Sequence, residues 1–336
     1  LGFFGGIGGA SKRGIMVKGS NYLEALNQVE TVVFDKTGTL TQGIFKVRGI
    51  NPGNSFSEEQ LIEYAAYAEG YSNHPIALSI TEAYGRQIDK GRIGNYEEIA
   101  GKGIRAVIDG QIILAGNSRL MQAEKIEYSE VDTIGTIIHV AAEGTYAGYI
   151  VIADEIKADA ARAIKELKAL GIKKTVMLTG DTNSISARIG QQLGVDEVYA
   201  ELLPAGKVEK LEMLDSQKSR KGKIIFVGDG INDAPVLARA DIGMAMGGLG
   251  SDAAIEAADV VIMNDEPSSI PTAIKVARRT RGIVIQNIIF ALGVKGVFLL
   301  LGAVGIATMW EAVFADVGVA LIAILNAIRV INTKNI

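Results

Sequence analysis

Two patterns of apolar residues alternate along this 336-residue chain. Between residues 151 and 275, short apolar runs such as TVMLTGD, KIIFVGDG, DIGMAM and DVVIM are separated by helical patterns such as AARAIKELKAL, ISARIGQQLG and VEKLEMLDSQ. Strands that alternate with helices in this way are typical of a parallel sheet with helices on both faces. A further buried strand, TVVFD at residues 31–35, precedes this region, and the following KTGTLTQG is expected to be a loop.

Residues 49–150 show a different pattern. Ser57 and Gln60 form a capping-box signature before a helical segment, and a second helix is expected after Pro75. The short runs IRAVIDG, QIILAG, TIIHVAAEG and TYAGYIVIAD then predict an antiparallel sheet. We interpret this region as a two-layer α+β insert in the α/β domain.

Residues 283–331 are almost entirely apolar, and Lys295, Glu311, Asp316 and Arg329 are their only charged residues. This length suits two membrane-spanning helices and a short turn, at roughly 20 residues per span. The alternative is a hairpin buried in a soluble core. Positive residues flank both open ends, so both ends are expected in the cytoplasm, with Trp310 at the far interface. These residues are Arg278, Arg279, Arg281, Arg329 and Lys334.

These patterns predict five segments, and the start at Leu1 suggests a piece of a longer protein. The segments are 1–26, the cytoplasmic end of a preceding membrane helix and a linker; 27–48 and 151–278, the two parts of the α/β domain; 49–150, the insert; and 279–336, the transmembrane helix pair.

Composition narrows the range of functions. A hydrophobic content of 48% excludes a disordered chain, and a net charge of −4 without a strongly basic stretch argues against nucleic acid as a partner. The chain has no cysteine and only two histidines, His74 and His139. Disulfides, thiolate metal sites, cysteine nucleophiles and histidine-rich metal sites within it are therefore excluded.

Polar residues follow three of the predicted strands, where ligands bind in parallel sheets. Asp35 is a candidate nucleophile for attack on phosphorus, and Asp229 and Asp233 are candidate magnesium ligands. Thr179 and Gly180 can donate to phosphate oxygens, and Lys207 can supply positive charge. The alternative for Asp35 alone is a strand-end aspartate that caps a loop.

Three motifs in this order resemble those of P-type ATPases: DKTGTLT at 35–41, TGD at 179–181 and GDGINDAP at 228–235. The core also resembles haloacid-dehalogenase-like phosphotransferases. The resemblance implies a parallel-sheet phosphorylation domain with an inserted α+β nucleotide-binding domain and a C-terminal transmembrane hairpin. It implies these catalytic residues: Asp35, Lys36, Thr37, Thr179, Gly180, Asp181, Lys207 and Asn232. It implies these magnesium-site residues: Asp35, Thr37, Asp229 and Asp233.

One departure from the wider superfamily is informative. Its phosphatases usually carry a second aspartate, as general acid–base, where this chain has Thr37. Without that base, water is poorly activated and an aspartyl phosphate should persist, as a pump requires.

The insert contains SNHP at 72–75 and GKG at 101–103 rather than a Walker-type loop. These residues, with Glu69, resemble the nucleotide-binding motif of the heavy-metal (type IB) branch. The resemblance implies ATP contacts at Glu69, His74, Gly101, Gly103 and Gly116, with Asn117 nearby. Alone, a His-Pro pair is more often a helix start and Gly-x-Gly a turn. We interpret His139 as structural. Asp154 and Lys157 lie where the family has a hinge motif, so the resemblance implies that they are hinge residues near the phosphate site.

Lys295 and Asp316 are ionisable residues of opposite sign in the apolar segment, and both would lie at similar depth if the chain turned near Gly305. A structural ion pair is one interpretation. The flanking sequences resemble the last two helices of zinc/cadmium/lead-exporting type IB pumps, in which the aspartate contributes to the metal site and the lysine acts as its counterion. The Met-Ser and Tyr-Asn signatures of copper pumps are absent here.

The resemblance covers the C-terminal half of such a pump. It implies ATP-driven export of divalent zinc, cadmium or lead across the plasma membrane through an aspartyl phosphate, with ATP and Mg²⁺ as cofactors and cytoplasmic catalytic domains. The expected partners are the lipid bilayer and the missing N-terminal half, with its Cys-Pro-Cys helix and actuator domain. Alone, the chain is expected to bind ATP without transporting metal. The alternatives are a membrane-anchored dehalogenase-type phosphatase and a non-catalytic nucleotide-binding fragment.

Overall fold

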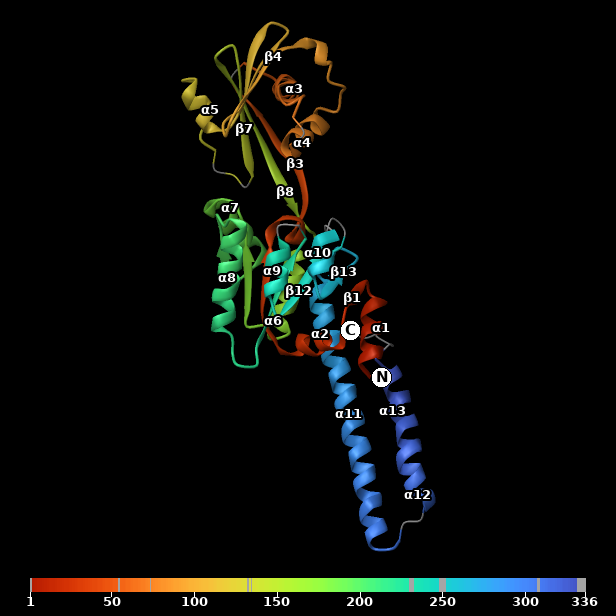
Figure 1. Ribbon diagram of the computed structural model, residues 1–336. Helices are drawn as coiled ribbons and strands as arrows, with labels where there is room; N and C mark the ends of the chain where they lie inside the picture. Colours follow the sequence, from red (N-terminus) through yellow and green to blue (C-terminus); the bar gives the residue numbers. More distant parts are fainter. Residues whose placement is uncertain are drawn as a thin grey trace. The chain divides into compact units, whose positions relative to one another are not determined.

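The chain folds into two compact units (Figure 1). The computed structural model describes residues 2–53, 55–72, 74–131, 133, 135–229, 233–247, 252–306 and 309–330. The first unit consists of Leu1–Leu40 and Lys157–Ile336, and the second unit of Thr41–Ile156.

A seven-stranded sheet forms the centre of the first unit. Its strands, in spatial order, are β1 (Ile15–Val17), β13 (Val260–Ile262), β12 (Ile242–Met246), β11 (Lys223–Gly228), β2 (Val29–Asp35), β9 (Lys174–Leu178) and β10 (Glu197–Tyr199). All neighbouring strands are parallel except β1, which pairs antiparallel with β13 at one edge. The predicted parallel sheet is confirmed. The edge strand β1 was not predicted.

Helices cover this sheet and complete its core. They are α6 (Ala160–Ala169), α7 (Asn183–Leu193), α8 (Pro204–Gln217), α9 (Ala234–Arg239) and α10 (Asp252–Ala257). Leu211 and Leu214 of α8 pack with Phe226 of β11 and Val33 of β2 in one buried cluster. Gly194 ends α7 in the left-handed conformation, with φ of 75°, as a helix-terminating glycine does.

The second unit has a six-stranded antiparallel sheet. Its strands, in spatial order, are β3 (Thr41–Pro52), β8 (Thr145–Ile156), β7 (Thr136–Ala142), β6 (Gln111–Gly116), β5 (Gly103–Ile108) and β4 (Ile93–Ile99). Helices α3 (Glu58–Ala68) and α4 (Pro75–Tyr84) cover one face. Leu120 and Met121 of α5 (Ser118–Ala123) pack with Leu114 on the other face. The insert therefore has a small third layer that the two-layer prediction lacked.

Two local predictions have different outcomes. The capping box is confirmed: Ser57 accepts a hydrogen bond from the Gln60 amide, and the Gln60 side chain accepts one from the Ser57 amide. The predicted loop after Asp35 is wrong in part. Lys36–Leu40 form a tight turn, and β3 begins directly at Thr41 because it pairs with the end of β8.

The second unit begins with β3 and ends with β8, because these two strands pair with each other. Their pairing runs from Thr41 opposite Ile156 to Pro52 opposite Gly148. Both strands belong to the six-stranded sheet, so the compact unit extends beyond the residues 49–150 expected from the sequence.

Near the N-terminus, α1 (Gly2–Ser11) packs against the long helix α11 (Ser269–Ala303). A Cβ at Gly6 would lie 2.5 Å from Thr280 Oγ1, so the close approach requires glycine there. Helix α2 (Ser20–Ala25) and the single turn Leu26–Gln28 lead into β2.

The C-terminal part is a helical hairpin. Helix α11 is followed by α12 (Met309–Val313), a π-helical turn at Phe314–Gly318 and α13 (Val319–Ile328). Two helical stretches, Ser269–Ala303 and Met309–Ile328, are long and apolar enough to cross a membrane, and only 6% and 18% of their most apolar windows are buried. Within this chain, these windows are far more exposed than the core helices of a soluble protein. Asn326 donates to Asn287 at 2.8 Å and joins the two helices.

Candidate active site and nucleotide cavity

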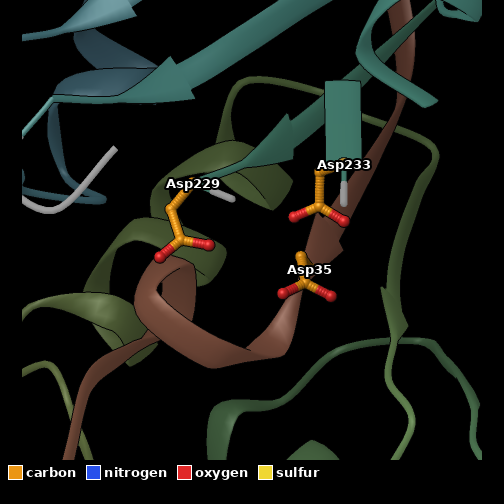
Figure 2. Close-up of side chains that lie close together, drawn as sticks. All are labelled: Asp35, Asp229 and Asp233. Atoms are coloured by element: carbon orange, nitrogen blue, oxygen red, sulfur yellow. The ribbon is translucent and has the colours of Figure 1, made fainter. Parts of the chain in front are cut away.

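Three aspartates converge at the carboxyl end of the parallel sheet (Figure 2). Asp35 is the last residue of β2, Asp229 follows the neighbouring strand β11, and Asp233 precedes α9. One oxygen from each carboxyl lies within 4.8 Å of the others. Asp35 and Asp233 are buried, so the strand ends place these carboxylates in a partly dry cluster.

Lys207 lies between two of these carboxylates. It belongs to the first turns of α8, and its Nζ is 2.5 Å from Asp35 Oδ1 and 2.9 Å from Asp233 Oδ1. Burial alone lowers the pKa of the Lys207 ammonium, but the two carboxylates raise it above its usual range. Lys207 is therefore a permanent cation in this cluster.

The TGD motif at 179–181 directly follows the neighbouring strand β9. Thr179 is buried, and its hydroxyl accepts a hydrogen bond from the Asp181 amide at 3.1 Å, which leaves the hydroxyl proton to be donated elsewhere. Gly180 is exposed. Asp181 forms an ion pair with Lys36 at 2.6 Å, which connects this loop to the turn after Asp35.

Gly38 forms the tightest point of that turn. Its φ is 71°, and a Cβ on it would lie 1.6 Å from Asp229 Oδ2. The neighbouring Thr37 is exposed. Asn232, the remaining predicted catalytic residue, lies outside the described residues.

The donor set fits a magnesium ion. All three acidic groups offer carboxylate oxygens, which Mg²⁺ prefers. Burial raises the pKa of Asp35, the Asp233 carboxylate raises it further, and Lys207 opposes both. Burial, followed by the charge of Asp233, raises the pKa of Asp229 to about 6. The three carboxylates thus repel one another and have only one ammonium beside them, and a divalent cation would reduce this repulsion.

A second ion pair, between the buried Lys157 and the partly buried Asp265, supports the turn after Asp35. Lys157 Nζ donates to the Gly38 carbonyl at 2.8 Å and to Asp265 Oδ2 at 2.8 Å. Lys157 was predicted as a hinge residue, whereas Asp265, between β13 and α11, was missed. Its signal in the sequence is weak, because an Asn-Asp pair before a helix usually indicates only a turn. The other predicted hinge residue, Asp154, accepts a hydrogen bond from Thr41 within the second unit.

The second unit contains a cavity of about 360 Å³. All five residues predicted to contact nucleotide line it: Glu69, His74, Gly101, Gly103 and Gly116. Asn117 lines it as well, together with Glu98 and Lys102. The structure therefore brings this set together from the ends of α3, β5 and β6, the start of α4 and the loops beside them.

The glycines of this cavity have different roles. Gly103 and Gly116 are partners across β5 and β6, and a Cβ on Gly103 would lie 2.3 Å from the Ala115 carbonyl oxygen. They therefore allow the close approach of two strands at the cavity wall. Gly101 has a φ of 69° and serves a turn, and a Cβ on it would meet no atom within 4 Å. His74 caps α4 through Nδ1, which accepts from the Ile76 amide, so it is a helix start that also lines the cavity.

His139 does not itself line this cavity, although its cross-strand partner Gly116 and its neighbour Ile138 do. It is buried on β7 and its Nδ1 is 2.8 Å from the Tyr146 hydroxyl, as expected of a structural histidine. Burial lowers its pKa.

Lys295 of α11 and Asp316 of the π-helical turn also meet. Lys295 Nζ is 2.6 Å from Asp316 Oδ1, so the chain reversal places them at similar depth in the hairpin. Both side chains are more than half exposed within this chain.

A parallel sheet with a strand-end aspartate, a lysine and two further aspartates defines a class of phosphotransferases and hydrolases. Residues 29–241 match the haloacid dehalogenase-like hydrolase family, and the chain belongs to it.

Over nearly its whole length the chain is similar to metal-transporting ATPases. It is 62% identical to the cadmium, zinc and cobalt-transporting ATPase of Bacillus subtilis (100% of this chain, 48% of the relative) and 60% identical to the zinc-transporting ATPase of Synechocystis (98% and 46%). A crystal structure of a zinc-transporting PIB-type ATPase superposes with a TM-score of 0.84 at 35% identity (98% of this chain, 54% of the other). The chain thus spans about half the length of these relatives.

Proposed function

We propose that this chain is the catalytic, C-terminal half of a P-type ATPase that exports divalent zinc, cadmium or lead. The observation that carries this proposal is the Lys207-bridged aspartate cluster, in a chain whose similarity to metal-transporting ATPases extends through the apolar hairpin. ATP binds in the cavity of the second unit, and its γ-phosphate is transferred to Asp35.

The proposed chemistry uses groups already in place. A carboxylate oxygen of Asp35 forms a bond to the γ-phosphorus, and the bond between that phosphorus and the β,γ-bridging oxygen breaks, so ADP leaves. Lys207 opposes the rise in the pKa of Asp35 that burial causes, and it then neutralises the phosphoryl oxygens. The Thr179 hydroxyl and the Gly180 amide are donors to the same oxygens, while Lys36 orients the second loop through Asp181.

Magnesium would be held by Asp35 and Asp229, with Asp233 beside them and Thr37 at the turn. When bound, Mg²⁺ offsets the charge of the transferring phosphoryl group. Asp229 contributes one carboxylate and also fixes the turn, because it fills the space that a side chain at Gly38 would need.

The hairpin is proposed to lie in the plasma membrane, with the catalytic units in the cytoplasm. Its apolar surface is exposed over most of its length, and the arginines near its open end favour that orientation. Asp316 would bind the exported divalent ion, and Lys295 would replace that ion as counterion after release. A carboxylate suits divalent zinc or cadmium better than monovalent copper.

The first test is phosphorylation by ATP labelled at its γ-phosphate, in the presence of magnesium. We expect an acid-stable, hydroxylamine-sensitive label in this chain and none in Asp35→Asn. The matched control is Asp89→Asn, which removes an exposed carboxylate of the second unit and should leave the label intact. A label that Asp35→Asn retains would contradict the proposal.

The cargo needs a separate test in the complete pump. Zinc or cadmium should stimulate phosphorylation, and Asp316→Asn should abolish that stimulation while leaving ATP binding unchanged. Stimulation by monovalent copper alone would contradict the proposed cargo.

A further inference from the structure

A groove of about 430 Å³ lies between the two helices of the C-terminal hairpin. Helices α11 and α13 pack along each other, and the described residues that line the groove come from these helices and the residue that ends α13 (Figure 1). Its volume falls in the range of small-molecule sites, roughly 300–1,000 Å³, and far exceeds that of a single ion. The groove is separate from both the aspartate cluster and the cavity of the second unit.

Amide groups and one arginine line the part of the groove nearest the open end of the hairpin. Asn326 donates to Asn287 at 2.8 Å, and Gln286 is exposed beside them. Arg329 Nη1 donates to Asn326 Oδ1 at 2.9 Å, and among the described residues Arg329 has no carboxylate partner. Because a guanidinium has five N–H donors, most of those of Arg329 remain available to a ligand.

The neighbouring arginines strengthen the positive charge at this end. Arg279 donates to the Arg329 carbonyl at 3.4 Å, so a second guanidinium group belongs to a residue directly beside the groove. Arg281, by contrast, forms an ion pair with Glu24 at 3.4 Å and does not line the groove. The charge at this end therefore favours an anionic ligand and opposes a cation.

Apolar side chains line the rest of the groove, towards the turn of the hairpin. Phe290, Ile322 and Leu325 are 40%, 44% and 59% exposed within this chain. Gln286 precedes Val304, the residue that ends α11, by 18 positions, or about 27 Å at about 1.5 Å per residue, which is close to the ~30 Å thickness of the hydrocarbon layer. In a bilayer, the polar part of the groove would thus lie at the headgroup boundary and the apolar part in the hydrocarbon.

We propose that this groove binds one anionic phospholipid of the cytoplasmic leaflet. Arg329 binds the lipid phosphate, the neighbouring amides donate to the remaining headgroup oxygens, and an acyl chain covers Phe290 and Ile322. A zwitterionic headgroup fits less well, because no carboxylate among the described lining residues could bind its cationic group. The inference rests on the proposed placement of the hairpin in a membrane.

The test is native mass spectrometry of the full 336-residue chain, released from detergent micelles after titration with phosphatidylglycerol or phosphatidylcholine. Both lipids have the same acyl chains, so their dissociation constants differ only through the headgroup. We expect the first phosphatidylglycerol to bind about tenfold more tightly than the first phosphatidylcholine, the equivalent of one charge-assisted hydrogen bond.

Arg329→Gln tests the headgroup contact. The preference for phosphatidylglycerol should fall to about twofold or less, whereas Arg329→Lys should keep most of it, because an ammonium also binds phosphate. The matched control is Arg281→Gln, which removes the same charge at the same end of the hairpin but outside the groove, and should leave the preference unchanged.

Ile322→Trp tests the acyl-chain contact. The larger side chain would fill the apolar part of the groove, so the first molecule of either lipid should bind more weakly by a similar factor, and the ratio between the lipids should persist. The control is Leu321→Trp, which places the same side chain at the neighbouring exposed position, outside the groove, and should leave both affinities unchanged.

Equal affinity for the two lipids in the unmodified chain would overturn the inference. An equal loss of preference in Arg329→Gln and Arg281→Gln would also overturn it, because it would indicate general attraction to the basic end of the hairpin. Labelling of Asp35 from ATP in the same preparation tests the proposed catalysis separately. If the chain did not float with lipid vesicles, both the inference and the proposed membrane placement would fail.

Discussion

At the scale of single residues, the site depends on Gly38, which has no side chain, as much as on its charged residues. Gly38 has a backbone conformation that L side chains rarely adopt, and Asp229 occupies the volume where its Cβ would be. The turn after Asp35 can approach Asp229 closely only because residue 38 is glycine.

Gly38→Ala should therefore abolish phosphorylation. Because the added methyl would push Asp229 or the turn away by an ångström or more, we expect a loss of about 100-fold or more in the rate of labelling from ATP. Gly194→Ala is the control, since Gly194 has a similar φ and no atom within 4 Å of its Cβ position. It should cost about 1 kcal/mol of stability and retain the label. Near-normal labelling of Gly38→Ala would show that the turn tolerates displacement.

Glu30 provides a pH-dependent test at the opposite end of the sheet. Its carboxylate accepts from the Ser219 amide at 2.7 Å and from Lys173 Nζ at 2.9 Å, and these contacts lower its pKa to about 2. Because the folded-state pKa lies below the unfolded value, the stabilisation is complete above about pH 4.5 and is lost as pH falls towards 2.

Glu30→Gln should lower the free energy of unfolding by about 1–2 kcal/mol at neutral pH. The difference from the unmodified chain should shrink progressively below about pH 4.5 in thermal melts recorded at a series of pH values. A difference that is constant down to pH 2 would mean that the charge of Glu30 does not contribute.

At the scale of elements, the segment between β8 and α6 connects the turn after Asp35 to the N-terminal end of α11. The Lys157 amide donates to the Leu40 carbonyl, and its ammonium bridges Gly38 and Asp265. Two residues later, Asp159 accepts from the Ser268 amide directly before α11. A displacement of the turn is thus linked by direct contacts to the helix that carries Lys295.

Lys157→Met should destabilise the first unit by about 1–3 kcal/mol, because it leaves the Gly38 carbonyl and the partly buried Asp265 without the buried ammonium that binds both. Adding Asp265→Asn should restore part of that loss, since the uncompensated charge is removed. Thermal unfolding of the two single variants and the double variant measures this coupling. Strict additivity of the two effects would contradict the pairing.

The elements also show what could be predicted from sequence. The carboxylate cluster was predictable, because Asp35 and Asp229 both end apolar runs and parallel strands end at one edge. The contact of Lys157 with Asp265 was not, because these residues lie 108 positions apart and neither pattern indicates the other. The close pairing of Gly103 with Gly116 was not predictable for the same reason, since it depends on the register of β5 and β6.

At the scale of the whole molecule, the second unit has a hydrophobic core of its own. Residues of α3 and α4, including Leu61 and Ile80, pack on the sheet residues Ile113 and Ile150, and all four are fully buried. The described residues that line the cavity proposed for nucleotide all belong to this unit.

Residues 41–156 expressed alone should therefore fold and bind ATP with an affinity within about twofold of the whole chain. Calorimetry and the dispersion of amide resonances are the measurements. His74→Ala in the same piece should weaken binding without loss of the fold. A piece that is unfolded, or folded without binding, would show that the first unit is needed.

Thr41 and Ile156, the two ends of that unit, are opposite partners in neighbouring strands. For the first unit, the whole second unit is thus an inserted loop whose two ends already lie side by side. The entropy of closing a loop grows with the length of flexible chain, but a folded insert with adjacent ends adds almost none. Two paired strands at this position therefore place little limit on the size of the inserted unit. Recombination could replace the second unit with a larger or smaller one, provided that the first and last strands of the new unit were antiparallel neighbours.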